Sequence, residues 1–167
     1  MPILIDGHNL ITRVPGLHLD NLDDENQLVS LLLEYCRLRR KQIDCYFDKA
    51  SSGHPRIQKH GLVTAIFARP GKTADDEIMQ KLVRLGAKAK NWMVVSSDAS
   101  VRIAAKAARA TVISAEAFAH DLFSALKDDL QVEKDRQEPS LNEEELEQWL
   151  VLFGQNEDEQ DLGSPEK

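Results

Sequence analysis

The chain has 167 residues, of which 42% are hydrophobic and 29% charged, a balance typical of one globular domain with a sizeable core. No run approaches ~18 consecutive apolar residues, which excludes a membrane-spanning protein. Eight Gly and six Pro exclude collagen-like and wholly disordered chains, and Cys36 and Cys45 are too few for a disulfide framework or a zinc site. The start, MPILIDGHN, has no basic n-region or long apolar h-region, so we expect a soluble, cytoplasmic, reduced protein without a membrane partner.

The net charge of −7 is unevenly distributed along the chain. Residues 1–132 carry 18 Lys and Arg against 16 Asp and Glu, whereas residues 133–167 carry 3 against 12. The body is therefore mildly basic, and the acidity belongs to the C-terminal segment. The overall charge is for this reason a poor guide to the partners of the body.

The first predicted elements are a strand, a turn, a helix and a second strand. Residues 3–5 form a β-branched strand, and the following Asp6-Gly7-His8-Asn9 has the composition of a tight turn. Leucines at three- and four-residue steps predict a helix over about 24–41, in which Asp24 and Gln27 resemble a capping box. The sequence IDCYF, residues 43–47, is typical of a second strand.

The alternation of strands and helices continues to about residue 132. A basic segment over 49–60 leads to a third strand, and Thr73 with Asp76 three residues later predicts a helix start. The further elements are a strand over 61–67, a helix from Thr73 to Gly86, a strand over 92–97, a helix over about 99–108, a strand over 110–113 and a helix from about Ser114. This order predicts an α/β fold with a mostly parallel sheet and helices on both faces.

The C-terminal segment differs from the body in composition. We expect a linker over 133–139, an amphipathic helix over 140–154 and a disordered acidic tail over 155–167, after a folded domain over 1–132. The helix opens with Ser140 and Glu143 at capping-box spacing. Its apolar face consists of Leu141, Leu146, Trp149, Leu150 and Phe153. Because such a face is costly to leave in water, we expect it to dock on the body or, as a helix over 140–153, in a groove of a partner protein.

Four aspartates follow predicted strands or open the helix after one. Asp6, Asp48 and Asp98 follow the first, second and fourth strands, and Asp75 lies in the first turn of the helix after the third. Carboxyl ends of parallel strands meet at one edge of a sheet, so we expect these carboxylates to converge. Converged carboxylates repel one another unless a hard divalent cation such as Mg²⁺ or Mn²⁺ neutralises them. Such a site can activate water and stabilise the leaving oxygen of a phosphodiester.

Each aspartate taken alone has a simpler explanation. Asp75 can complement a helix dipole, and Asp48 and Asp98 can be ordinary turn formers. Asp6 is harder to explain in this way, because it directly follows a buried strand. The joint placement of all four favours a metal site.

Other polar residues stand close to these aspartates in the sequence. Asn9 can hold a carboxylate or a loop carbonyl, Ser97 can do the same beside Asp98, and His8 is near enough to contact a substrate phosphate. The chain has no GxGxxG, no GxxxxGK[ST] and no GxSxG around Ser97, which argues against dinucleotide sites, P-loop sites and serine hydrolases.

Four ordered motifs carry a resemblance to a known family. ILIDGHNLI, CYFD, TADDEI and VVSSDASV resemble the NYN domain family of the PIN-like ribonuclease superfamily, and the YacP-like bacterial subgroup in particular. The resemblance covers about residues 1–130 and implies a PIN-like α/β sandwich with metal-dependent endoribonuclease activity on single-stranded RNA. Some YacP-like members act on messenger RNA at the ribosome, and no residue of this chain carries that association over.

The resemblance also implies roles for individual residues. Asp6 matches the first-strand metal acid and Asn9 the Asn of the D-G-x-N motif. Asp75 matches the acid of the T-A-D motif and Asp98 that of the S-D motif, with Asp48 as a looser match after the second strand.

The acid that follows the T-A-D motif is an addition to the pattern. Asp76 is either a further metal ligand beside Asp6, Asp75 and Asp98 or only a helix-capping residue.

Basic residues in the connections after the second and third strands are candidates for RNA contacts. They are Lys49, Arg56, Lys59, Arg69 and Lys72. A rim of such charges around an acidic floor can hold a phosphodiester backbone, although ordinary solvated loop charge also explains each one. The scarcity of aromatic residues predicts weak sequence selectivity.

The sequence therefore predicts an Mg²⁺- or Mn²⁺-dependent endoribonuclease of the PIN-like type. Two alternatives stay open: a non-catalytic RNA- or ribosome-binding module, and a metal-dependent phosphatase of the same fold class. A phosphatase of the haloacid-dehalogenase type needs a second acid two residues after its nucleophile, a position that His8 occupies here.

Overall fold

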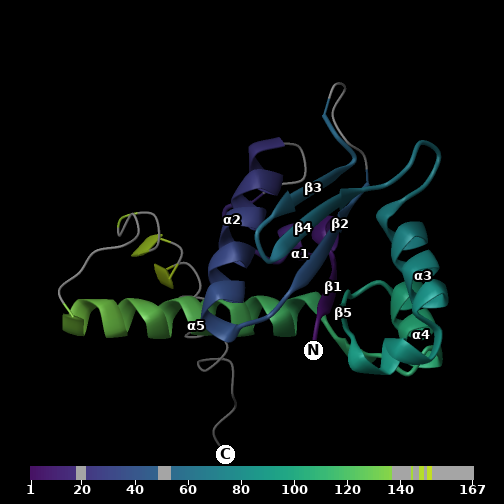
Figure 1. The fold of residues 1–167 in the computed structure, drawn as a ribbon. Coiled ribbons are helices and arrows are strands. Elements are labelled where there is room, and N and C mark those ends of the chain that lie inside the picture. The colour runs from purple at the N-terminus through teal and green to yellow at the C-terminus, as the bar shows by residue number, and fades with distance from the viewer. Residues whose placement is uncertain (18–21, 49–53, 137–143, 145–146, 149, 152–167) are drawn as a thin grey trace, which may run out of the picture.

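The computed structural model describes residues 1–17, 22–48 and 54–136, together with 144, 147–148 and 150–151. In this part of the chain, one six-stranded sheet has the order β3-β4-β2-β1-β5-β6 (Figure 1). The strands are β1 (Ile3–Asp6), β2 (Ile43–Phe47), β3 (Ile57–His60), β4 (Val63–Phe67), β5 (Met93–Val95) and β6 (Thr111–Ile113). Every pairing is parallel except that of β3 with β4, which confirms the predicted α/β fold with a mostly parallel sheet.

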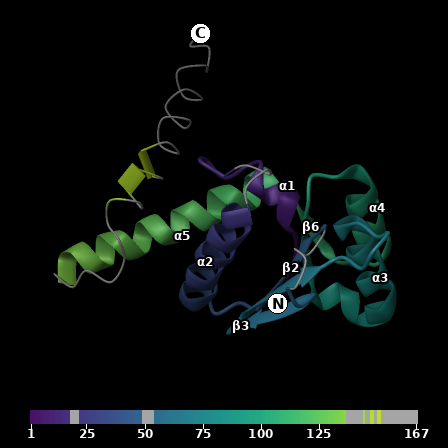
Figure 2. The same ribbon diagram turned by 90° about the horizontal axis from the view of Figure 1, so that it is seen from above.

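Helices cover both faces of the sheet. They are α1 (Gly7–Ile11), α2 (Leu22–Arg39), α3 (Ala74–Leu85), the 3-10 helix η1 (Gly86–Asn91), α4 (Ala99–Ala107) and α5 (Ala115–Arg136). The helices α1, α2 and α5 lie on one face, and α3 and α4 lie on the other (Figure 2). None of the helices in the described segments is long and apolar enough for a bilayer crossing.

The two faces of β1 supply two separate cores. Ile3 and Ile5 pack with the α1, α2 and α5 layer, whereas Leu4 packs with the α3 and α4 layer. Successive strand side chains point to opposite faces, so a strand covered on both sides reads as the continuous apolar run ILI. Cys36 and Cys45 are buried free thiols within the first core, as their small apolar character predicts.

The predicted tight turn over residues 6–9 is wrong, because the chain enters a helix there. Asp6 is the N-cap of α1, and its Oδ1 accepts a hydrogen bond from the Asn9 backbone N–H at 3.4 Å. The helix has only five residues, too few for a periodic apolar pattern to show in the sequence.

The predicted connection over residues 49–60 contains an edge strand. β3 runs antiparallel to β4 and its side chains are mostly exposed, so the buried alternation that signals a strand is missing from its sequence. The third predicted strand begins at Val63 rather than at residue 61, because Gly61, with φ +58°, lies in the turn between β3 and β4.

Two predicted helix boundaries also shift. α2 begins at Leu22, so Asp24 lies buried in its first turn rather than at the N-cap position. α5 continues to Arg136, so residues 133–136 of the expected linker are helical. By contrast, Thr73 and Asp76 form the predicted capping box of α3, and Gly86 ends that helix.

The expected C-terminal helix lies largely outside the described residues. Those of its residues that are described, at positions 144, 147–148 and 150–151, are helical. Lys134 Nζ on α5 lies 3.4 Å from the carboxylate of Glu147. The division into body, helix and tail stays a prediction, and the expected tail over 155–167 lies outside the described residues.

Gly7→Ala is expected to lower the free energy of unfolding by about 1–3 kcal/mol. A Cβ at position 7 would lie 2.5 Å from Phe47 Cε1 and 2.8 Å from the Tyr46 carbonyl oxygen. Phe47 is fully buried and stacks on Phe67, so its ring has no room to yield. Replacing glycine by alanine inside a helix ordinarily stabilises the helix by about 1 kcal/mol. A lower stability of Gly7→Ala would therefore have a steric cause.

Urea unfolding measures this difference. Ser100→Ala on the exposed side of α4 is the matched control, with an expected change within about 0.5 kcal/mol. A Gly7→Ala protein as stable as the parent would contradict the close approach of α1 to Phe47.

Candidate active site

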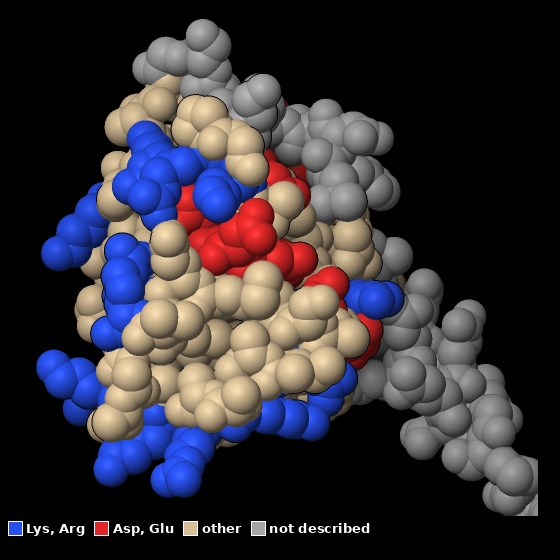
Figure 3. Space-filling view, turned by 90° about the vertical axis from the view of Figure 1, so that its right-hand side faces the viewer, with Lys and Arg blue, Asp and Glu red and all other residues tan. Residues whose placement is uncertain are grey.

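The parallel topology brings the four predicted aspartates to the carboxyl edge of the sheet. Asp6 ends β1, Asp48 follows β2, Asp75 lies in the first turn of α3, and Asp98 is the N-cap of α4 after β5. Their charges act on one another, since Asp48, Asp76 and Asp98 all raise the pKa of Asp75. Figure 3 shows acidic side chains gathered into one patch on the α3 and α4 side, with Lys and Arg next to it.

Asp6 and Asp75 form the centre of this cluster. Burial of Asp6, which is 6% exposed, together with its hydrogen bond to Asp75 and the charge of that carboxylate, raises the pKa of Asp6 to about 7. Burial also raises the pKa of Asp75, and the hydrogen bond with Asp6 opposes that rise. Because the two carboxyl groups share this hydrogen bond, they titrate as a pair, and the pair holds a proton more strongly than a free aspartate does.

Asp48 is fixed by two donors from different elements. Its Oδ1 accepts from the Ala74 backbone N–H at 2.9 Å, at the start of α3, and its Oδ2 lies 2.8 Å from His8 Nδ1. Burial disfavours the charged carboxylate, but these two hydrogen bonds and the positive charge of His8 lower its pKa overall. Asp48 therefore stays ionised and ties the loop after β2 to the helix that carries Asp75.

His8 bridges Asp48 and a second acid, Glu25 on α2. Its Nε2 lies 2.9 Å from Glu25 Oε1. Burial disfavours the imidazolium, yet the hydrogen bonds that it donates to Glu25 and Asp48, together with the negative charges of these carboxylates, raise the pKa of His8 to about 9. His8 is thus a cation at neutral pH beside the acid cluster, with both ring nitrogens donating to carboxylates.

Asn9 positions the loop that precedes Asp98. Its Oδ1 accepts from the Ser97 backbone N–H at 2.8 Å, and the neighbouring Ser96 Oγ accepts from the Asp98 backbone N–H at 3.1 Å. Asp98 Oδ1 in turn accepts from the Val101 backbone N–H at 3.1 Å. Asn9 therefore accepts from a backbone N–H group, whereas the sequence predicted a contact with a carboxylate or a loop carbonyl.

The Ser97 hydroxyl serves α5 rather than Asp98. It donates to Glu116 at 2.6 Å and accepts from the Ala115 backbone N–H at 3.0 Å. Glu116 also pairs with Arg13 at 2.9 Å. These contacts give Ser97 a structural role in fixing the start of α5 on the loop after β5.

Asp76 is an exposed capping residue. Its Oδ2 accepts from the Thr73 backbone N–H at 3.0 Å, while Thr73 Oγ1 accepts from the Asp76 backbone N–H at 3.2 Å. Of the two roles that the sequence left open, these contacts favour the cap.

The basic residues predicted as a rim differ in whether they contact other side chains of the protein. Arg69 Nε lies 3.1 Å from the buried carboxylate of Glu77, which also accepts from the Arg69 backbone N–H at 3.1 Å, so Arg69 is bound to α3. Arg56 and Lys72 are exposed, in the segments before β3 and before α3. Lys49 lies outside the described residues.

The donor set fits a hard divalent cation in its chemistry. Asp6, Asp75 and Asp98 offer only oxygen ligands, and a cation would offset the burial and the neighbouring negative charge that disfavour the ionised form of Asp6. Within the described segments, no three His, Cys, Asp or Glu side chains are placed to hold a metal ion together.

Comparison with known proteins identifies the family. Residues 3–152 match the YacP-like NYN domain. The chain belongs to the YacP-like NYN domain family. This is a family of PIN-like nucleases, so its function relates to RNA. The comparison with curated proteins gave no match.

Two solved structures of a YacP protein share the fold. Rae1 (YacP) from Bacillus subtilis is similar with a TM-score of 0.68 and 21% identity, over 100% of this chain and 99% of that one. A point mutant of the same Bacillus subtilis protein gives a TM-score of 0.66 and 24% identity, over 86% and 89%. At such identities the similarity shows the fold alone.

Sequence reasoning missed Glu25, Ser96 and Glu77. They contact His8, Asp98 and Arg69 respectively. Glu25 and Glu77 are 17 and 8 positions from their partners, and no local motif links them. Ser96 lies only two positions before Asp98, a spacing at which a serine hydroxyl commonly contacts the backbone, so the sequence offered a signal for this residue alone.

Asp6→Asn is expected to make the metal-free protein more stable at about pH 8. Asp6 binds its proton more tightly in the folded state, at a pKa of about 7, than at its ordinary value of 3.8. The folded state therefore loses stability as pH rises from about 4 to 7, and asparagine removes that loss. The advantage of the variant should shrink as pH falls toward 5, as measured by urea unfolding in EDTA.

Asp76→Asn is the control for this experiment. It removes an exposed charge of the same cluster but weakens a helix cap, so it should lower stability by up to about 1 kcal/mol without such a pH trend. An Asp6→Asn protein less stable than the parent at pH 8 would refute the buried carboxyl pair.

Glu25→Gln is expected to lower the pKa of His8 from about 9. The change removes one of the two carboxylates that stabilise the imidazolium and leaves Asp48 in place. NMR titration of the His8 ring measures the shift. Glu34→Gln, on the same helix but paired with Arg37, should leave the His8 pKa unchanged, and equal pKa values in both variants would contradict the bridge.

Proposed function

We propose that this protein is a metal-dependent endoribonuclease that hydrolyses phosphodiester bonds in single-stranded RNA. The observation that carries the proposal is the buried Asp6–Asp75 carboxyl pair, with Asp48 and Asp98 beside it, at the carboxyl edge of a sheet in a YacP-like NYN domain. Ligand sites of open α/β sheets lie at this edge. Messenger RNA at the ribosome, in the cytoplasm, is one form of substrate that the proposal covers.

Asp6, Asp75 and Asp98 are the residues proposed to hold Mg²⁺ or Mn²⁺. A divalent cation bound there supplies charge neutralisation and an activated water for in-line displacement at phosphorus. Asp6 must release its proton to become a ligand, and its pKa of about 7 places that release near neutral pH. RNA cleavage should accordingly increase as pH rises through this range.

The other residues of the site act by positioning and by binding. Asp48, held by His8 and the start of α3, fixes the turn of helix that presents Asp75. Asn9 fixes the loop that presents Asp98. Arg56 and Lys72 are exposed cations available to the phosphodiester backbone.

Asp6→Asn, Asp75→Asn and Asp98→Asn should each reduce RNA cleavage at least about a hundredfold, because each removes a proposed ligand carboxylate. The assay is endonucleolytic cleavage of a labelled single-stranded RNA with Mn²⁺, with Mg²⁺ and with EDTA. Asp76→Asn is the matched control, and its activity should stay within about threefold of the parent, since Asp76 caps α3. Urea unfolding of each variant shows that the protein is folded.

Two outcomes would refute the proposal. If Asp6→Asn and Asp98→Asn both cleave at the parent rate, the acid cluster is not the active site. If the parent binds RNA but cleaves it with neither metal, the protein is an RNA-binding module.

A further inference from the structure

A second charged feature lies at the opposite end of α3 and α4 from the acid cluster. Residues 81–109 contain seven Lys and Arg and a single acid, Asp98, which caps the far end of α4. Exposed cations gather at the C-terminal ends of α3, η1 and α4, and we call this set the basic edge. It consists of Arg84, Lys88, Lys90, Lys106 and Arg109. Figure 3 shows Lys and Arg along the lower border of this side, separated from the acidic patch by a largely uncharged area.

Within the described residues, the cations of the basic edge have no acidic partners. Among the residues that the structure describes, none of the five makes an ion pair, whereas Arg13, Arg37, Arg39 and Arg69 elsewhere all do. Lys81, at the start of the segment, pairs with Asp44 at 3.9 Å and lies over the Trp92 ring. The positive charge of the basic edge is therefore uncompensated within the described chain.

Helix capping does not account for this gathering of charge. Backbone amides already satisfy the helix ends: the Gly86 N–H donates to the Leu82 and Val83 carbonyls, and the Ala108 N–H to that of Ala104. A cation in a last helical turn gains about 0.3–1 kcal/mol from the helix dipole. Lys88 and Lys90 belong to a short 3-10 helix and gain little from such a dipole.

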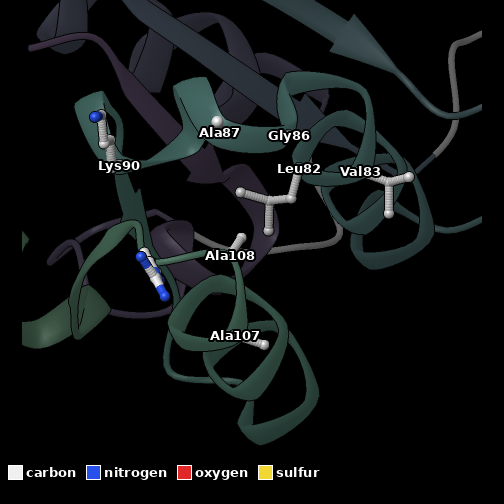
Figure 4. Close-up of a pocket in the computed structure, with 8 residues that line it drawn as sticks. Leu82, Val83, Gly86, Ala87, Lys90, Ala107 and Ala108 are labelled. Carbon is white, nitrogen blue, oxygen red and sulfur yellow. The ribbon is translucent and has the colours of Figure 1, made fainter.

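A hollow of about 430 Å³ separates the two ends of the basic edge. Leu82, Val83 and Ala108 form apolar parts of its lining, and Lys90 and Arg109 contribute the charged groups (Figure 4). Lys90 and Arg109 thus place an ammonium and a guanidinium at the border of the hollow, and the guanidinium suits bidentate contact with phosphate oxygens.

The residue types of this surface indicate which class of polyanion it can bind. Single-stranded nucleic acids bind by stacking bases on aromatic rings, but Trp92, the aromatic residue of the 81–109 segment, is half-buried under Lys81. An RNA duplex presents its phosphates on a rigid frame and needs no stacking partner. The cations of the basic edge therefore suit a duplex backbone better than a single strand.

We propose that the basic edge binds the phosphate backbone of duplex RNA. The inference rests on the proposed function for RNA as the ligand class, and it adds a second contact surface. The twelve residues of α3 span about 18 Å, so the basic edge lies one helix length from Asp75. A structured RNA held there would leave an adjoining single strand free to reach the acid cluster along the same side of the molecule.

The test compares two charge-matched double variants of the full chain. Lys88→Gln/Lys90→Gln removes two cations of the basic edge, and Lys41→Gln/Lys127→Gln removes two from the α2 and α5 side. Fluorescence anisotropy in EDTA measures binding to a blunt RNA duplex of about 20 base pairs at several salt concentrations. The first variant should bind roughly tenfold more weakly at low salt, with the slope of log K against log salt reduced by about 2. The second should match the parent.

Three outcomes would overturn the assignment: equal affinity of all three proteins, equal weakening in both variants, or a loss seen only with single-stranded RNA. Polyglutamate is the probe for polyanions in general, and binding as tight as that of the duplex would also overturn it. Cleavage of a ten-nucleotide single strand by Lys88→Gln/Lys90→Gln should stay at the parent rate. If the parent does not cleave but the duplex result holds, only the proposed function fails.

Discussion

The constraint on which the site depends is the forced proximity of two carboxyl groups, Asp6 and Asp75. One ends a strand buried on both faces and the other begins a helix, so neither can withdraw without moving a core element. The apolar cores on the two sides of β1 hold that geometry against the electrostatic repulsion. Burial, the hydrogen bond with Asp75 and the charge of that carboxylate together raise the pKa of Asp6.

Polar contacts between elements keep the rest of the acid cluster in place. The chain of contacts from Glu25 through His8 and Asp48 to the Ala74 amide joins α2, α1, the end of β2 and α3. A second contact, from Asn9 to the Ser97 amide, joins α1 to the loop after β5. Both begin on the five-residue helix α1, whose tight seat against Phe47 leaves room only for glycine at position 7. The positions of the side chains in the site therefore depend on the packing of one short helix.

The α3 and α4 layer carries opposite charges at its two ends. Acids gather where these helices begin, next to the carboxyl ends of the strands, and unpaired cations gather where they end. A polyanion along this side would meet attraction at the basic edge and repulsion at the acid cluster unless a divalent cation is bound. In the proposed function, RNA binding and RNA cleavage would take place at different ends of the same two helices.

The sequence determined most of the architecture, because its long elements have strong local signals. The apolar run of β1, the β-rich sequence of β2, the capping box of Thr73 and Asp76, and the strand–helix alternation predicted a mostly parallel sheet and placed four aspartates at one edge. The family followed from the same four segments. Only the tertiary structure showed that the polar edge strand β3 exists, that Glu25 meets His8, and that Ser97 serves α5. β3 was missed because its side chains are mostly exposed and show no buried alternation. The other two contacts join residues 17 and 19 positions apart, and their energies depend on positions in space that leave no periodicity or motif in the sequence.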